Sequence, residues 1–390
     1  MMPSWINKAT IYVLGWCLYG TQGFFVPKGT IFSQLLLMVL LLVSLYYVFV
    51  ANTRYKLPKY FFGLNLLIGL FTVYGIYLII HHDTMDFILE RDSFIYLKTI
   101  FKSLLPIYVF YVFFKQRLVN KQVFYLCIVT FFIVTTCQYY QHQREQLIAA
   151  MLMGSSAEEF TNNIGYLFLS LIPACVFLYK KPFLQYLAVG YIMVFLFLGM
   201  KRGALVIGLF CLIWFLFNNL KNYEWKKKFG IIFLSSLLCV GGFIFAKNQM
   251  EESFYFQRRI DSTLEGNSSG RDQLYSYFAY YVWNETSPLQ FLFGSGADAT
   301  LKISYNYAHN DWLEIMVNQG IFGVLIYILY WILFLKECVS KRYPSDVKLS
   351  LQLLFIIYFM KTIFSMSYGN VGISAAFILG YCLAQEKNDE

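Results

Sequence analysis

The feature that most restricts this chain is a series of apolar runs, each about 20 residues long, that recurs along its whole length. A run of that length is what an α-helix needs to cross the hydrocarbon core of a bilayer. The sequence is also 58% hydrophobic and only 14% charged, far from the balance of a soluble domain. It therefore predicts an all-α polytopic membrane protein with no room for a separate soluble domain.

We expect about twelve transmembrane helices, separated by polar stretches. We place them at 5–25, 30–51, 60–80, 94–114, 123–140, 164–179, 183–200, 203–220, 229–246, 321–335, 349–366 and 371–384. The first lacks a strongly charged leader and a cleavage site of small residues, so we expect an uncleaved anchor. The chain then divides into 1–246 with nine helices, a long loop over 247–320, and 321–390 with three helices and a tail.

Basic residues set the orientation, because Lys and Arg gather in cytoplasmic loops. With a cytoplasmic amino terminus, 18 of the 31 Lys and Arg residues fall in cytoplasmic segments and 10 on the other side. Five of those 10 lie in the long loop. We therefore expect both termini in the cytoplasm and the loop 247–320 on the opposite side of the membrane.

Several functions are disfavoured by composition. The net charge of +9 is explained by basic loops at an anionic membrane surface, so no nucleic-acid partner is expected. Seven of the eight cysteines lie in predicted spans, and no metal-ligand spacing occurs, so no metal or cofactor is expected. No carboxylate lies inside a predicted span and no internal repeat is visible, which disfavours an ion-coupled transporter.

The loop 247–320 is too long for an ordinary connection, and such loops are usually functional or disordered. Its segment 271–283 has aromatic residues at helical spacings and predicts an interfacial helix lying on the outer surface. The flexible "GNSSG" at 266–270 leads into it, and Pro288 and the "FGSG" at 293–296 mark turns. We therefore expect an ordered loop with short helices.

The stretch "YAHNDWLEIMVNQG" at 307–320 reads as the start of a helix. Asp311 with Glu314 three residues later fits a capping box, and Gly320 can end the helix before the next span. His309 and Asn310 then lie at a helix amino terminus, where backbone N–H groups and the helix dipole favour an anion. The sequence predicts a phosphate-binding neighbourhood here.

Other polar residues expected near the outer face leave alternatives open. His81 and His82 fit an interfacial helix end, and His142 fits a solvated loop, whereas His309 has a context suited to catalysis or binding. Three lysines within predicted spans either snorkel to the interface or form a shared cationic pocket for a lipid diphosphate with Arg202 and Arg271: Lys98, Lys102 and Lys361.

Four motifs in order resemble the O-antigen ligase and polymerase superfamily. They are "GMKRGALVIGLF" (199–210), "SGRDQLYSYF" (269–278), "FLFGSG" (291–296) and "AHNDWLEIMVNQGIFG" (308–323). The resemblance is close in the second half of the chain and extends to the first half only in the number of spans. It implies a GT-C-like membrane glycosyltransferase with a periplasmic loop lying over a membrane cavity.

The resemblance also implies roles for individual residues. Arg202 and Arg271 would hold the diphosphate of the donor, and His309 would act as the base on the acceptor hydroxyl. Neighbouring side chains are expected to bind substrate: Lys201, Asn310, Tyr275, Lys98, Lys102 and Lys361, together with Arg258 and Arg259, either of which could replace Arg271 at the diphosphate. Tyr275 either stacks on sugars or rests among lipid headgroups.

The implied activity is metal-independent transfer of a glycan carried on undecaprenyl diphosphate. We expect a polymerase that joins lipid-linked repeat units of O-antigen or capsule; a ligase that transfers the finished polysaccharide to lipid A core is the alternative. A third possible function is that of a flippase of lipid-linked oligosaccharides or another transporter. The expected partners are the lipid-linked donor, a glycan acceptor, the membrane and a chain-length regulator.

Overall fold

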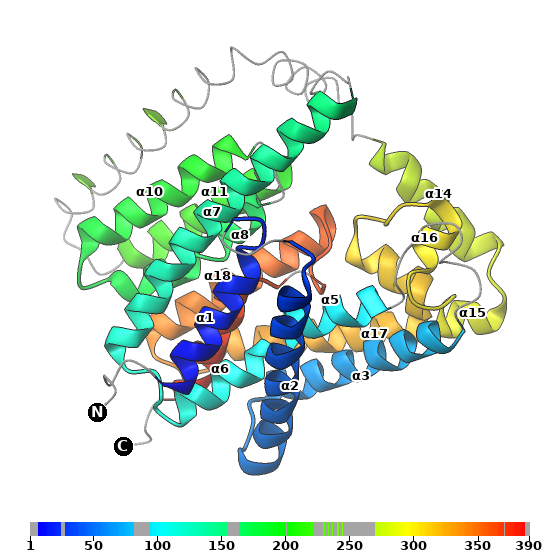
Figure 1. Cartoon of the computed structure of the whole chain (residues 1–390), viewed down its shortest axis with the longest axis horizontal. Helices are drawn as coiled ribbons and strands as arrows, with labels where there is room; N and C mark the ends of the chain where they lie inside the picture. Colours follow the sequence, from blue (N-terminus) through cyan, green and yellow to red (C-terminus); the bar gives the residue numbers. More distant parts are fainter. Residues whose placement is uncertain are drawn as a thin grey trace.

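A computed structural model describes residues 7–24, 28–81, 94–153, 164–199, 201–220, 270–369 and 371–386, with scattered positions between 229 and 244. Helices make up most of these ranges, and no β-strand occurs within them (Figure 1). The predicted all-α class is confirmed. The predicted span 229–246 falls largely outside the described residues, as do Arg258, Arg259 and His82.

Seven of the described helical segments are long and apolar enough to cross a bilayer. They contain α2 (Ile31–Arg54), α3 (Lys59–Ile80), the pair α5 (Phe94–Leu104) and α6 (Pro106–Lys115), α7 (Lys121–Met153), α11 (Arg202–Leu220), α17 (Asp311–Val339) and α18 (Ser345–Phe364). Shorter apolar helices include α10 (Pro182–Leu198) and α19 (Ile373–Ala384). The chain is a multi-pass membrane protein, and the number twelve stays a prediction.

Some predicted boundaries are wrong. The first helix, α1 (Lys8–Gly20), is shorter than the predicted 5–25, and α7 continues past residue 140, because polar residues end an apolar run without ending a helix. The predicted span 164–179 is broken into α8 (Gly165–Leu169), α9 (Ile172–Cys175) and η1 (Val176–Leu178). Pro173 lies at the start of α9, where its missing N–H interrupts the hydrogen bonds of a continuous helix.

The centre of the bundle is α6, in which every residue from Pro106 to Phe114 is buried. A helix that is apolar on all sides needs neighbours on all sides, and α6 packs against α2 and α19. Beside it, α17 packs against both α3 and α18, and α18 packs against α11. This chain of contacts joins the core to the elements that carry the predicted site residues.

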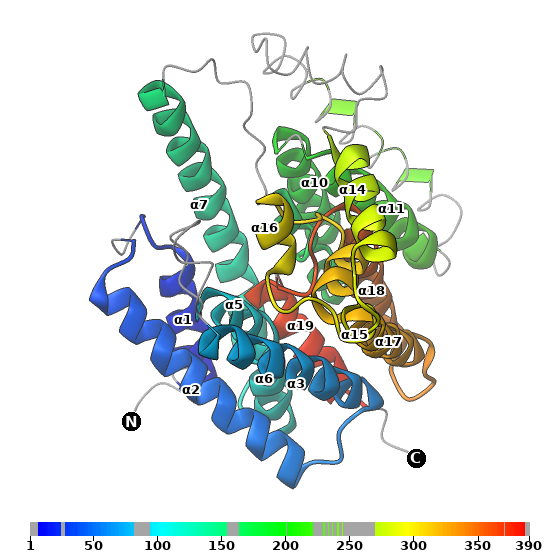
Figure 2. The same ribbon diagram turned by 90° about the vertical axis from the view of Figure 1, so that its right-hand side faces the viewer.

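The loop 247–320 is folded, as predicted, over its described residues 270–320. It contains α14 (Arg271–Asn284), α15 (Pro288–Phe293) and α16 (Ala299–Ser304), which gather at one end of the molecule, around the first half of α17 (Figures 1 and 2). The helix predicted over 271–283 is confirmed by α14. These elements share a second small core with α17: Phe278, Val282, Ala299, Ala308 and Val317.

A break in α17 fixes the position of this loop. Gly320 has φ 67° and ψ −166°, so the polar helix start and the predicted span 321–335 form one element with an interruption, rather than two separate helices. The carbonyl groups of Val317 and Asn318 accept hydrogen bonds from the N–H groups of Ser295 (2.8 Å) and Gly296 (3.0 Å). The "FGSG" turn thus docks against the break in the helix.

The two ends of the bundle are distinct. The Asn7 side chain donates to the Leu118 carbonyl at 2.6 Å, and Glu386 lies 3.5 Å from Lys115 and 3.9 Å from Arg342. One end of the bundle therefore holds the first described residues, two loops predicted as cytoplasmic and the end of α19. The start of α17 lies at the opposite end, about 40 Å away along a helix of this length. The predicted division into two faces is therefore consistent with the fold.

Replacing Gly320 by Ala should disrupt the docking of the outer loop. A Cβ atom there would lie 2.5 Å from the Gly294 nitrogen and 2.6 Å from the Leu292 carbonyl, in a backbone conformation that only glycine adopts readily. We expect a loss of about 2–3 kcal/mol in the free energy of unfolding, measured by thermal or denaturant unfolding in detergent.

Gly69→Ala is the matched control, because Gly69 is helical and a Cβ there would meet nothing within 4 Å. It should leave stability unchanged or raise it by up to about 1 kcal/mol. If Gly320→Ala is as stable as the wild type, the glycine break in α17 is not required for docking of the loop.

Candidate active site

His309 is held between two anchored neighbours. The N–H group of Ala308 donates to the Glu314 carboxylate at 2.9 Å, and the Asn310 side chain caps α17 by accepting from the N–H groups of Trp312 (2.9 Å) and Leu313 (3.3 Å). His309 itself has φ 52°, a left-handed conformation that a non-glycine residue adopts only when its surroundings hold it there. The half-buried imidazole therefore projects from a constrained backbone.

The carboxylate of Glu314 is fully buried and holds this loop in place. Besides the Ala308 N–H group, it accepts from the Thr300 hydroxyl at 2.5 Å and the Asn318 side chain at 3.0 Å. Each of its partners belongs to a different part of the fold: α16, the loop before His309, and α17. One side chain thus links the three segments.

The predicted capping box is wrong in register. Asn310, and not Asp311, is the N-cap of α17, and Glu314 reaches past the cap to the backbone of Ala308. Asp311 is instead fully buried and accepts from the Ser367 N–H group (2.9 and 3.0 Å) and the Tyr327 hydroxyl (2.6 Å). Its hydrogen bonds therefore tie α17 to the segment after α18.

Arg271 is the first residue of α14 and lies beside His309. Its guanidinium donates to the carbonyl group of Phe364 at 2.9 Å, at the end of α18. Burial lowers the pKa of the His309 imidazole from its ordinary value, and the positive charges of Arg271 and Lys201 lower it further. The imidazole is therefore expected to be neutral at pH 7, although two cations lie next to it.

The start of α11 approaches the same place. A Cβ atom on Gly203 would lie 2.5 Å from the Tyr166 hydroxyl and 2.9 Å from the Phe364 side chain, so only glycine allows α11 to approach α8 and α18 this closely. Lys201 and Arg202, both half-buried, directly precede this glycine. The start of α11 thereby brings Lys201 and Arg202 to the region that Arg271 occupies.

Lys361 is the most enclosed of the predicted cations that the structure describes. Its side chain is 2% exposed, its ammonium lies 5.2 Å from the centre of the Tyr166 ring, and it interacts electrostatically with Asp311. It sits one turn before Phe364, whose carbonyl group binds Arg271. The snorkelling alternative is therefore wrong for Lys361.

The remaining predicted residues are placed differently. Lys98 is exposed on α5, and Lys102 lines a separate recess of about 180 Å³ bounded by α1, α5, α7 and the start of α19. That recess shares no lining residue with the group around His309. The shared cationic pocket for these lysines stays a prediction.

Tyr275 and Asn310 have structural contacts at the site. The Tyr275 hydroxyl donates to the carbonyl groups of His309 (3.4 Å) and Ile363 (3.5 Å), and the oxygen of the Asn310 side chain is used by the helix cap. Both residues therefore help to position His309.

Tyr166 and Glu314 were not predicted as site residues. Glu314 lies three residues after Asp311 in the motif, but nothing in the sequence marks Tyr166.

The segment that carries His309 and Arg271 matches a known protein family. Residues 187–328 match the family described as O-Antigen ligase, a segment that includes Lys201, Arg202, Arg271 and His309. The predicted resemblance to the O-antigen ligase and polymerase superfamily is confirmed by this match. Members of the family are membrane glycosyltransferase-like enzymes. No curated protein matches the chain.

Lys201→Gln tests the electrostatic coupling at His309. Removing this positive charge should raise the pKa of the imidazole, because protonation no longer meets its repulsion. If the neutral imidazole is the active form, activity is lost as the pH falls through this pKa. The acidic limb of the pH profile of kcat/KM should therefore move to higher pH in the variant.

The control is Lys302→Gln, because Lys302 is exposed at the end of α16 and is not among the charges that act on His309. Its profile should overlay that of the wild type. An acidic limb in Lys201→Gln that is unmoved, or displaced to lower pH, would contradict the coupling.

Proposed function

We propose that this protein is a polymerase that joins undecaprenyl-diphosphate-linked oligosaccharide repeat units of O-antigen or capsular polysaccharide. The observation that carries the proposal is the His309 imidazole on a constrained loop, its pKa lowered by burial and by the charges of Arg271 and Lys201, within the segment that matches the O-Antigen ligase family. The site would face the periplasm of a bacterial inner membrane, with both termini in the cytoplasm. The opposite placement of the basic loops and of His309 supports this orientation.

The reaction breaks one bond and forms one bond at the anomeric carbon of the donor sugar. The acceptor hydroxyl oxygen attacks this carbon, the bond to the diphosphate oxygen breaks, and the electron pair leaves with the diphosphate. The hydroxyl proton passes to the His309 imidazole, whose lowered pKa favours the neutral form that can accept it.

Departure of the diphosphate requires positive charge that is already in place. In this proposal Arg271, Arg202 and Lys201 supply it, assisted by Lys361 from the membrane side, so no metal is needed. The amino termini of α11 and α14 begin at two of these residues and add their partial positive charges. Arginine is well suited to this task, because its planar guanidinium can bind two phosphate oxygens at once.

Ligation is the second candidate, and the description of the matched family favours it. The two activities share donor and chemistry but differ in acceptor: another lipid-linked repeat unit for a polymerase, lipid A core for a ligase. Deleting the gene separates them. Lipopolysaccharide with a single repeat unit indicates lost polymerisation, whereas core without repeats, with accumulated lipid-linked polymer, indicates lost ligation and would overturn the polymerase.

His309→Ala should fail to restore the deletion strain, with turnover of the purified enzyme reduced about a hundredfold or more, because a positioned base contributes about that much. His142→Ala, on α7, is the matched control and should restore wild-type polysaccharide. Both variants are compared at equal membrane abundance. Normal polysaccharide from His309→Ala would remove the imidazole from the mechanism.

Arg271→Lys should reduce kcat/KM for the lipid-linked donor about a hundredfold, which corresponds to about 3 kcal/mol. A lysine keeps the charge but loses the planar pair of donors and the hydrogen bond to the Phe364 carbonyl. Arg144→Lys, at an exposed position of α7, should behave as wild type. Wild-type kinetics in Arg271→Lys would show that the guanidinium does not hold the diphosphate.

A further inference from the structure

A groove opens between α7 and α10 at the end of the bundle opposite His309. It has a volume of about 670 Å³, within the range of about 300–1,000 Å³ that is usual for sites of small molecules. Its walls are apolar and face outwards, and four of the side chains that line it are 43–58% exposed: Val129, Ile133, Leu184 and Leu187. An exposed apolar groove on a membrane protein faces the acyl chains of the bilayer.

The rear of the groove is fixed by contacts between its walls. The Tyr191 hydroxyl of α10 is hydrogen-bonded to Thr136 of α7 at 2.6 Å, and its ring lies 5.9 Å from that of Phe132. Tyr125 of α7 donates to the Phe177 carbonyl of η1 at 3.1 Å. The short helix α8 packs against both α7 and α10, so the groove between them is built into the fold.

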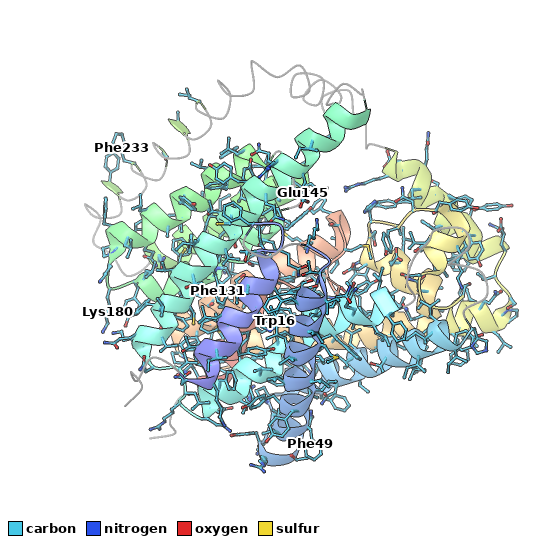
Figure 3. All side chains as sticks on the ribbon, in the orientation of Figure 1. Trp16, Phe49, Phe131, Glu145, Lys180 and Phe233 are labelled. Atoms are coloured by element: carbon cyan, nitrogen blue, oxygen red, sulfur yellow. The ribbon has the colours of Figure 1, made fainter. Side chains whose placement is uncertain are left out.

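Positive charge gathers at one end of this groove. Lys121, Lys180 and Lys181 line it, and Lys180 lies at the edge of the bundle where α10 begins (Figure 3). An adjoining hollow of about 650 Å³ shares Lys121 and Lys180 with the groove and adds Lys115 and Arg117.

The acids in the adjoining hollow do not balance this charge. They are Asp346 and Glu386, so the five cations of the combined site exceed the two acids by three. Glu386 is paired with Lys115 at 3.5 Å. No ion pair among the described residues includes Lys121, Lys180 or Lys181.

We propose that this groove binds an anionic phospholipid, with an acyl chain between α7 and α10 and the headgroup phosphate among Lys121, Lys180 and Lys181. A lipid satisfies both parts of the site, because its chain covers the apolar walls and its phosphate neutralises the surplus charge. A soluble anion would meet only the lysines. The site is separate from the proposed glycosyl-transfer site and does not depend on it.

Native mass spectrometry of the delipidated full-length protein in detergent tests the proposal, with phosphatidylglycerol and phosphatidylcholine as probes. Wild type should bind phosphatidylglycerol in preference to phosphatidylcholine. The triple variant Lys121→Gln, Lys180→Gln, Lys181→Gln should bind phosphatidylglycerol at least about tenfold more weakly. All three lysines are exposed, so the changes leave the core intact.

Ala188→Trp, which fills the groove, should weaken phosphatidylglycerol binding to a similar extent. Two controls should match the wild type: the triple variant Lys56→Gln, Lys59→Gln, Lys341→Gln at exposed lysines of the same end, and Val39→Trp on the exposed face of α2.

Three results would overturn the proposal. The first is equal phosphatidylglycerol binding by the groove-lysine variant and wild type. The second is unchanged binding by Ala188→Trp together with displacement of the lipid by glycerol phosphate, which would indicate a site for a soluble anion. The third is a mass of two chains in place of a lipid adduct, lost in the same variants, which would identify a second copy as the occupant.

Discussion

The candidate site depends on one buried carboxylate. Glu314 accepts hydrogen bonds from the Ala308 N–H group, the Thr300 hydroxyl and the Asn318 side chain, and so holds the loop of His309 against α16 and α17. A buried carboxylate is costly unless its oxygens are satisfied, so each of these contacts is strongly favoured once the fold encloses it. The left-handed backbone of His309 is maintained by the same contacts.

Around this anchored loop, the fold brings basic residues from three elements together. Lys201 and Arg202 come from the start of α11, Arg271 from the start of α14, and Lys361 from α18. Positive charges that lie close together repel one another, and Asp311 offsets part of this repulsion beside Lys361. A bound diphosphate would offset more, which is why we regard the cluster as an anion site and not only as structure.

The sequence predicted the order of the helices better than their exact boundaries and the contacts between them. The apolar runs identified most helices, and aromatic spacing identified α14, because both signals are local. Asn310 and Asp311 are both good N-caps, so only the backbone geometry could show which one caps α17. The partner of the "FGSG" turn is the break at Gly320, a contact between segments that no local pattern reveals.

Two lysines show the same limit of prediction from sequence. Lys102 and Lys361 both lie in apolar runs and are equivalent by sequence, yet Lys361 is buried beside Tyr166 while Lys102 lines a different recess. Which lysine joins the site is decided by how α5 and α18 pack, and this information is tertiary. The motifs therefore pointed to His309, Arg202 and Arg271 as candidates, whereas only the packing of the helices shows which other side chains lie near them.

The most direct test of the account is an electron cryo-microscopy structure of the protein with undecaprenyl diphosphate bound. The account predicts phosphate density within hydrogen-bonding distance of Arg271 and next to the His309 imidazole. Phosphate density in the recess lined by Lys102, with none beside Arg271, would contradict it.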